Sequence, residues 1–169
     1  MITQTEVELY VRIRPSYEFV EYVSTMPGMT ELSSTIVLSE TGVDMSVFED
    51  EKHLCSWCGL APANNESAGK KKSVRITKAG AYLKPMMVQC ALAAIKSKKD
   101  PYFASKYQAL RHRRGNKKAI ISIARMMMCC IYHMTLGKMR PKIYFIFHSS
   151  AAVDSNNFRC MFFSHFIFL

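Results

Sequence analysis

The sequence lacks an apolar run long enough to cross a bilayer, which takes about 18 or more consecutive apolar residues. Its most apolar segment, residues 117–136, is interrupted by Arg125. The N-terminus also lacks the basic stretch followed by an apolar run that marks a secretory signal. We therefore expect no membrane association and a cytoplasmic location.

The chain has six cysteines, but their spacing does not match that of a zinc site or a disulfide scaffold. Only Cys55 and Cys58 form a C-x-x-C pair, and no second pair lies at the spacing of a zinc ribbon. Together with the missing secretory signal, this favours a reduced compartment over a disulfide scaffold. We expect buried thiols at this pair, and no metal or cofactor bound by this chain alone.

Acidic residues are scarce in the middle of the chain. Residues 70–118 hold 15 Lys/Arg against one acid, whereas residues 1–66 hold 3 Lys/Arg against 11 Asp/Glu. The net charge of +10 therefore combines an acidic first third with a strongly basic middle. This asymmetry favours a surface that binds a polyanion, and the alternative is a basic face that is merely solvated.

Glycine, proline and asparagine divide the rest of the chain into amphipathic stretches, which predict a mainly α, compact helical domain. The expected helices begin near Ser16 and cover about 30–42, 51–58, 80–98, 101–114 and 117–136. The last of these is apolar on several faces, which is typical of a helix in the middle of a bundle. Residues 59–77 are expected to form a basic surface loop.

Four segments, in this order, resemble the C-terminal domain of the insertion-sequence 110, 116 and 902 family of transposases: "MPGM…LSETG", "FEDEKHLCSWCGLAP", "NNESAGKKKSVRITKAGAYLK" and "YQALRHRRGNKKAIISIARMMMCCIYHM". The resemblance predicts three parts: a remnant linker or helix (1–21), the transposase C-terminal domain (22–139) and an atypical tail (140–169). The tail has aromatic clusters without a helical period, so it is interpreted as disordered, a strand pair or an out-of-frame extension.

The resemblance implies a recombinase with two domains. An N-terminal nuclease domain of the RuvC type carries four carboxylates that bind magnesium, and the C-terminal domain supplies a serine nucleophile. A non-coding bridge RNA guides target choice. DNA, this RNA, further copies of the chain and full-length transposase are the implied partners, and a nucleoid-associated location follows. No strand-borne pair of aspartates occurs here, so the chain is interpreted as truncated at its N-terminus, with magnesium expected only when the nuclease domain is present.

The serine motif of the family falls on Ser67 in "NNESAGK", and Ser73 is a second candidate. A serine hydroxyl is a weak nucleophile that needs activation and nearby positive charge. The cations that would neutralise a phosphate here are Lys70, Lys71, Lys72, Arg75 and Lys78. The alternative interpretation of this stretch is a solvated surface turn.

A second basic group surrounds Gly115 and Asn116. Its members are Arg111, Arg113, Arg114, Lys117 and Lys118. They are predicted to hold a nucleic-acid backbone, and ordinary solvation of a helix end is the alternative. The "MPGMT" segment resembles a helix-hairpin-helix turn in which Thr30 replaces the second glycine, which leaves a phosphate contact and a purely structural hairpin both open.

The sequence thus predicts a DNA-binding transposase domain of the serine-recombinase type, acting in DNA transposition with Ser67 as the inherited nucleophile. The alternative functions are a truncated, catalytically inactive remnant that binds nucleic acid, and an inert helical fragment.

Overall fold

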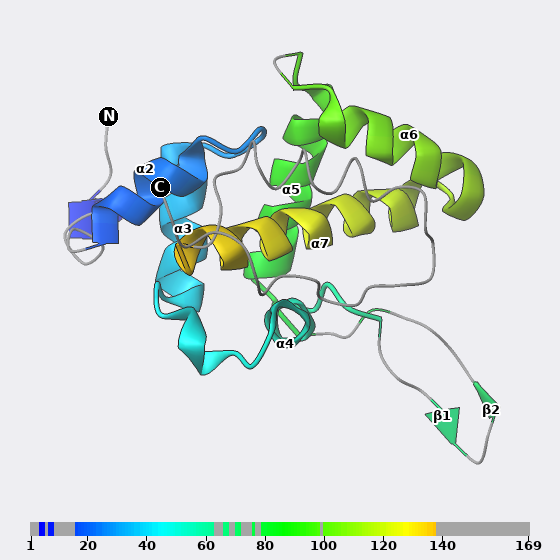
Figure 1. The fold of residues 1–169 in the computed structure, drawn as a ribbon, viewed down its shortest axis with the longest axis horizontal. Coiled ribbons are helices and arrows are strands. Elements are labelled where there is room, and N and C mark those ends of the chain that lie inside the picture. Colours follow the sequence, from blue (N-terminus) through cyan, green and yellow to red (C-terminus); the bar gives the residue numbers. More distant parts are fainter. Residues whose placement is uncertain are drawn as a thin grey trace, which may run out of the picture.

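The chain is mainly helical in the computed structural model, which describes residues 4–5, 7–8, 16–62, 66–67, 70–71, 76, 79–98 and 100–137 (Figure 1). Its elements are α2 (Tyr17–Ser24), α3 (Glu31–Thr41), the short 3-10 turn η2 (Met45–Val47), α4 (Glu51–Trp57), β1 (Glu66–Ser67), β2 (Lys70–Lys71), α5 (Leu83–Lys96), α6 (Tyr102–Arg114) and α7 (Asn116–Thr135). The fold class expected from the sequence is confirmed. The predicted tail, 140–169, lies outside the described residues.

The helices begin and end at the residues whose chemistry predicts a boundary. Thr30 and Ser33 form a capping box at the start of α3, because the Ser33 amide donates to Thr30 Oγ1 at 3.2 Å and the Thr30 amide donates to Ser33 Oγ at 2.8 Å. Asp50 caps α4 by accepting from the His53 amide at 2.7 Å. Gly115, at φ +80°, separates α6 from α7.

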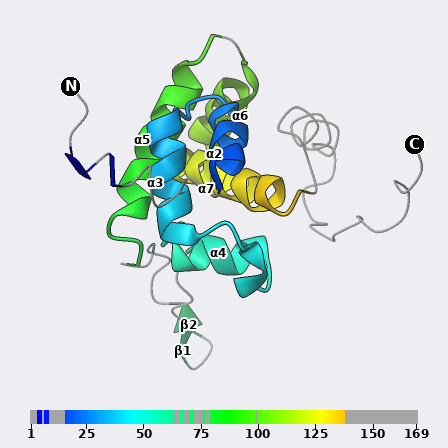
Figure 2. The same cartoon turned by 90° about the vertical axis from the view of Figure 1, so that its left-hand side faces the viewer.

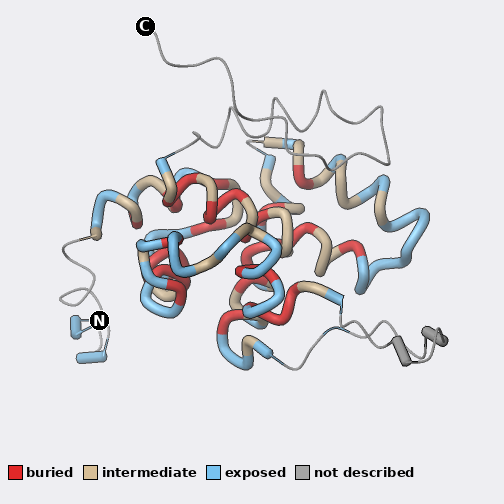
Figure 3. Tube along the Cα trace, turned by 60° about the horizontal axis from the view of Figure 1, so that its bottom comes forward, coloured by how far each residue is buried: buried red, intermediate tan, exposed pale blue. Residues whose placement is uncertain are grey.

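α7 is the central helix, as its apolar pattern predicts. It contacts α2, α4, α5 and α6, and Figure 1 shows it running through the middle of the molecule. Ile123, Met127, Met128 and Ile131 on this helix are fully buried. Figure 3 shows that the buried residues gather where the helices meet and that the outer surface of the α6 end is exposed.

α5 packs on α7 with the face that its spacing predicts. Leu83, Met87, Cys90 and Ala94 are buried, and Met86 packs against the same core from a partly exposed position. Pro85 lies in the first turn of α5, where its missing amide hydrogen removes no intrahelical bond. The amphipathic helix predicted over about 80–98 is therefore confirmed, with its buried face on α7.

The turn between α2 and α3 packs directly on α5. Gly28 has φ +84°, and a Cβ atom at this position would overlap the Cys90 carbonyl oxygen. Met26 and Met29 on either side of it are buried. The turn faces the core, and the capping box binds the Thr30 and Ser33 amides, so both features serve a structural hairpin.

Candidate nucleic-acid interface

A small antiparallel strand pair carries the candidate nucleophile. β1 pairs with β2 in a register that sets Ser67 opposite Lys70 and Glu66 opposite Lys71, and a further bridge joins Pro62 to Ile76. We call the segment 59–80 the arm. Figures 1 and 2 show β1 and β2 beyond α4, apart from the helical body. The sequence pattern predicts only a loop here, so the strand pairing is a feature that it missed.

Two glycines hold the base of the arm together. Gly59 has φ +69°, and a Cβ atom there would overlap the Ala79 carbonyl oxygen. Gly80 has φ +66°, and a Cβ atom there would overlap the Cys58 carbonyl oxygen. The two backbone segments therefore cross in direct contact, which only residues without a side chain permit. This crossing fixes the end of α4 against the approach to α5.

Two of the five cations predicted to accompany Ser67 lie among the described residues. The backbones of Lys70 and Lys71 lie in β2, next to the strand that holds Ser67. Lys72, Arg75 and Lys78 lie outside the described residues, as does Ser73. The structure thus brings one candidate serine and two lysines onto paired strands.

The second basic group lies on an open turn between α6 and α7. Its members, Arg111, Arg113, Arg114, Lys117 and Lys118, are all exposed. Apart from its neighbours in the chain, no atom of the described residues lies within 4 Å of where a Gly115 Cβ would stand. Within the described part of the chain, none of the five basic side chains forms an ion pair or a hydrogen bond with another side chain. The turn thus presents five free cations to solvent.

Helix electrostatics explain three of the five cations in this group. The three arginines lie in the last turn of α6, where the negative end of the helix dipole favours them. Lys117 and Lys118 lie in the first turn of α7, where the dipole is positive, no acid is present and no side chain caps the helix. Solvation of a helix end therefore accounts for the arginines but not for the two lysines.

The two basic regions lie toward the same end of the molecule. In Figure 1, the α6–α7 turn and the strands of the arm both lie at the right-hand end of the long axis, and α2 and α3 lie at the other end. α2 and α3, which belong to the acidic first third of the sequence, therefore lie at the end opposite to the two basic regions.

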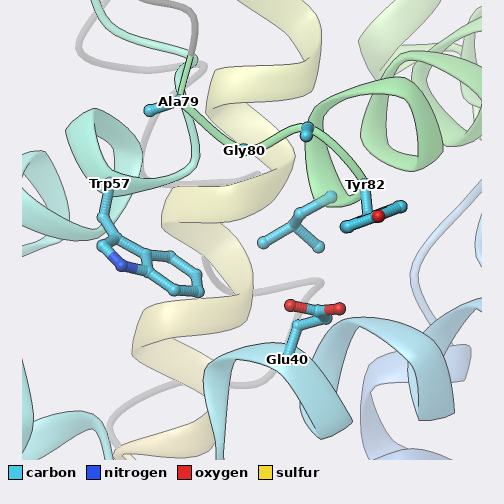
Figure 4. A pocket seen from close by; sticks show the side chains of 7 residues that line it. Glu40, Trp57, Ala79, Gly80 and Tyr82 are labelled. Atoms are coloured by element: carbon cyan, nitrogen blue, oxygen red, sulfur yellow. The ribbon is translucent and has the colours of Figure 1, made fainter.

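A shallow pocket of about 280 Å³ opens beside the base of the arm (Figure 4). Trp57, the last residue of α4, and Tyr82, which precedes α5, lie on its two sides, and Glu40 of α3 points toward it. The Trp57 and Tyr82 side chains are 47% and 82% exposed. The sequence pattern does not indicate this pocket, although Trp57 is the single tryptophan of the chain.

The C-x-x-C thiols are buried, as expected. Cys55 and Cys58 face the core, and the Cys55 Sγ lies 3.6 Å from the Cys129 Sγ. Burial raises the pKa of Cys58 to about 12, and the hydrogen bond with Cys55 together with burial raises the pKa of Cys129. The Cys58 and Cys129 thiols are therefore protonated at neutral pH and are poor nucleophiles.

A model of the Transposase IS116/IS110/IS902 family matches residues 20–108, which is more than half of the chain. The chain belongs to this transposase family. A role in transposition follows, and with it an interaction with DNA. Neither the curated proteins nor the solved structures gave a match to the chain.

The family match covers the arm but not the whole basic end of this transposase. Residues 20–108 include Ser67 and the paired strands, whereas the five cations of the α6–α7 turn follow the matched range. The interpretation of the turn therefore depends on its exposure and charge alone.

The described residues do not fit a magnesium site. Among them, no group of three or more His, Cys, Asp or Glu side chains is arranged to hold a metal ion. Acids near α4 serve the fold instead: Asp50 caps the helix, and Asp44 accepts from the Ser46 hydroxyl and amide, which lowers its pKa. No described helix combines the length and the apolarity needed to span a membrane.

Proposed function

We propose that this chain is the DNA-binding domain of a serine-type transposase and that the arm presents Ser67 as the nucleophile. The observation that carries the proposal is the register of β1 and β2, which sets Ser67 opposite Lys70 on a strand pair that lies apart from the helical body. A nucleophile at such a place can reach a DNA backbone without a clash between the helices and the duplex.

The proposed reaction is a transesterification. Ser67 Oγ attacks a phosphodiester phosphorus, a serine–phosphate bond forms, and one phosphorus–oxygen bond of the DNA breaks. The serine proton goes to a base, and the departing sugar oxygen takes up a proton. Lys70 and Lys71 lie next to Ser67 along the paired strands and supply positive charge near the developing negative charge.

The α6–α7 turn is proposed to hold the DNA backbone. Its cations contact phosphates, which gives affinity that is independent of base sequence and sensitive to salt. The uncompensated lysines at the start of α7 support this role, because they cost helix stability and have no partner within the described residues.

Activation of Ser67 is proposed to depend on groups outside the described residues. The resemblance implies a nuclease domain whose carboxylates bind magnesium, and the described acids form no such set. The chain on its own is therefore proposed to bind DNA without cutting it, which is also the behaviour of the alternative, an inactive nucleic-acid-binding remnant.

A covalent-adduct assay separates the two functions. The chain is mixed with end-labelled DNA carrying an element junction, with and without a nuclease domain of the family, guide RNA and magnesium, and analysed on denaturing gels. An adduct is expected only in the complete mixture. It should be lost in Ser67→Ala and retained in Ser73→Ala. An adduct that survives Ser67→Ala would show that another residue is the nucleophile, and no adduct under any condition would favour the inactive remnant.

A further inference from the structure

The pocket beside the base of the arm is lined by aromatic side chains that have no role in the proposed reaction of Ser67. Two aromatic side chains flank it, although a large exposed aromatic ring forgoes the free energy that burial would give. Trp57 lies two residues before Gly59, and Tyr82 lies two residues after Gly80. The glycine crossing therefore fixes both rings at the same end of the arm.

We propose that this pocket binds an unstacked base of single-stranded DNA, held between Trp57 and Tyr82. The proposal rests on the proposed function, because it assumes that DNA follows the arm toward Ser67. Stacking on aromatic rings is how proteins commonly hold unpaired bases, since every base has a π-face. Figure 4 shows the two rings on either side of the opening.

The Trp57 ring has a fixed support. Phe48 packs against it at 5.8 Å between ring centroids and an interplanar angle of 59°. Phe48 is itself packed against the core. A ring that a neighbouring side chain already restrains loses little conformational entropy when a ligand stacks on it.

The size and polarity of the pocket suit a base. Its volume of about 280 Å³ is below the range of about 300–1,000 Å³ that is usual for drug-sized ligands. Leu83 and the Gly80 backbone give it an apolar floor, and Glu40 adds one carboxylate. A carboxylate repels phosphate but accepts a hydrogen bond from the exocyclic amino group of a base, as in contacts of Glu or Asp with cytosine N4. The pocket therefore selects a base over the backbone, and cytosine over thymine.

Charge complementarity favours DNA over a peptide. The pocket adjoins the arm, which belongs to the segment with 15 Lys/Arg and one acid. Lysines on β2 draw a polyanion toward the arm, so a base is brought to the rings at high local concentration.

Trp57 is the only tryptophan, so its fluorescence reports directly on the pocket. The full chain is titrated with four 12-mers: oligo-dC, oligo-dT, an abasic deoxyribose-phosphate chain and oligo-C RNA. Binding is measured by the anisotropy of a labelled end, and stacking by quenching of Trp57. Oligo-dC is expected to bind more tightly than oligo-dT and to quench Trp57, and the abasic chain is expected to bind more weakly without quenching.

Variants complete the test. Tyr82→Ala should weaken oligo-dC binding about fivefold to a hundredfold. It should leave binding of the abasic chain unchanged. Glu40→Ala should remove the preference for cytosine. Tyr17→Ala is the control, because it removes an exposed tyrosine ring of α2 that lies outside the pocket and donates to Glu31, and it should change neither measurement.

The outcomes distinguish failure of the base pocket from failure of the proposed function. If oligo-dC binds without quenching Trp57, or if Tyr82→Ala has no effect, the base pocket is wrong and the proposed function stands. If no oligomer binds, both fail. Tighter binding and stronger quenching by the RNA would overturn the assignment to DNA. Quenching only by an added acidic peptide would assign the pocket to a protein partner.

Discussion

The Tyr107 hydroxyl donates a hydrogen bond of 2.7 Å to the Asn116 side-chain oxygen, so it ties the middle of α6 to the start of α7. This contact spans the turn that carries the five exposed cations. It fixes the direction in which the turn leaves α6, while Gly115 supplies the backbone conformation that no other residue adopts easily.

Tyr107→Phe removes this hydrogen bond and keeps the packed ring. We expect the free energy of unfolding to fall by about 0.5–1.5 kcal/mol, because one hydrogen bond is removed and the Asn116 amide can still reach water. Urea denaturation followed by circular dichroism measures the change. Ser122→Ala, which removes an exposed hydroxyl bond within α7, is the control and should have a smaller effect. An unchanged stability in Tyr107→Phe would mean that the contact does not hold the turn.

Neutralising the cations of the α6–α7 turn should lower DNA affinity and its salt dependence together. With Arg113, Arg114 and Lys117 each changed to Gln, the slope of log affinity against log salt should flatten by about 0.9 for each phosphate that the protein no longer neutralises. Filter binding of duplex DNA over a range of salt concentrations gives the slope. Lys52→Gln, an exposed lysine on α4, should leave it unchanged. Equal slopes in the triple variant and the wild type would exclude the turn from the interface.

Lys118→Glu should raise the stability of the chain and lower its affinity for DNA. An acid in the first turn of α7 meets the positive end of the helix dipole, so stability should rise by about 0.3–1 kcal/mol at low salt. DNA affinity should fall, because a cation is replaced by an anion. Lys96→Glu in the last turn of α5 is the matched control, and there the same exchange should lower stability. A loss of stability in Lys118→Glu would contradict the dipole argument.

Part of this fold was predictable from the sequence because it depends on local chemistry. The start of α3 is set by Thr30 and Ser33, which are three residues apart, and the central place of α7 follows from its apolar faces. The arm was not predictable in the same way. Its base depends on backbone contact between Gly59 and Gly80, which are far apart in the sequence, and neither glycine shows its partner in the local pattern.

The same distinction applies to the candidate site. Charge counts alone pointed to the basic end, since the cations of the α6–α7 turn are close together in the sequence. The pocket joins Glu40, Trp57 and Tyr82 from three separate elements, so it exists only once the helices have packed. Ser67 itself was identified by resemblance, and the structure adds the register that sets it opposite Lys70.

The glycine crossing gives a sharp stability prediction. A residue other than glycine at a positive φ costs about 1–3 kcal/mol of backbone strain. Gly59→Ala should lower the free energy of unfolding by more than this amount, because the new methyl group also overlaps the Ala79 carbonyl oxygen. Gly115→Ala has a similar φ and open space around it, so it should cost only the backbone strain. Thermal or urea unfolding of both variants gives the comparison. Equal losses would show that the two backbones do not cross as closely as described.

The buried thiol of Cys58 predicts how stability depends on pH. Its pKa is raised by burial from 9.0 to about 12, so the folded chain holds this proton more tightly than the unfolded chain does. The corresponding stability is fully present below pH 9 and is lost as the pH rises toward 12, because only the unfolded thiol ionises in that window. Urea denaturation at pH 8, 9, 10 and 11 should therefore show a free energy of unfolding that falls as the pH rises. Cys58→Ala also loses packing, which lowers its stability equally at every pH. Once this constant difference is subtracted, the fall with pH should be shallower in the variant. Alkylation by iodoacetamide at pH 8 should modify Cys58 quickly in urea and slowly in the native chain. Fast modification of the native chain, or an identical pH profile in the variant, would place this thiol in contact with solvent and contradict its burial against α7.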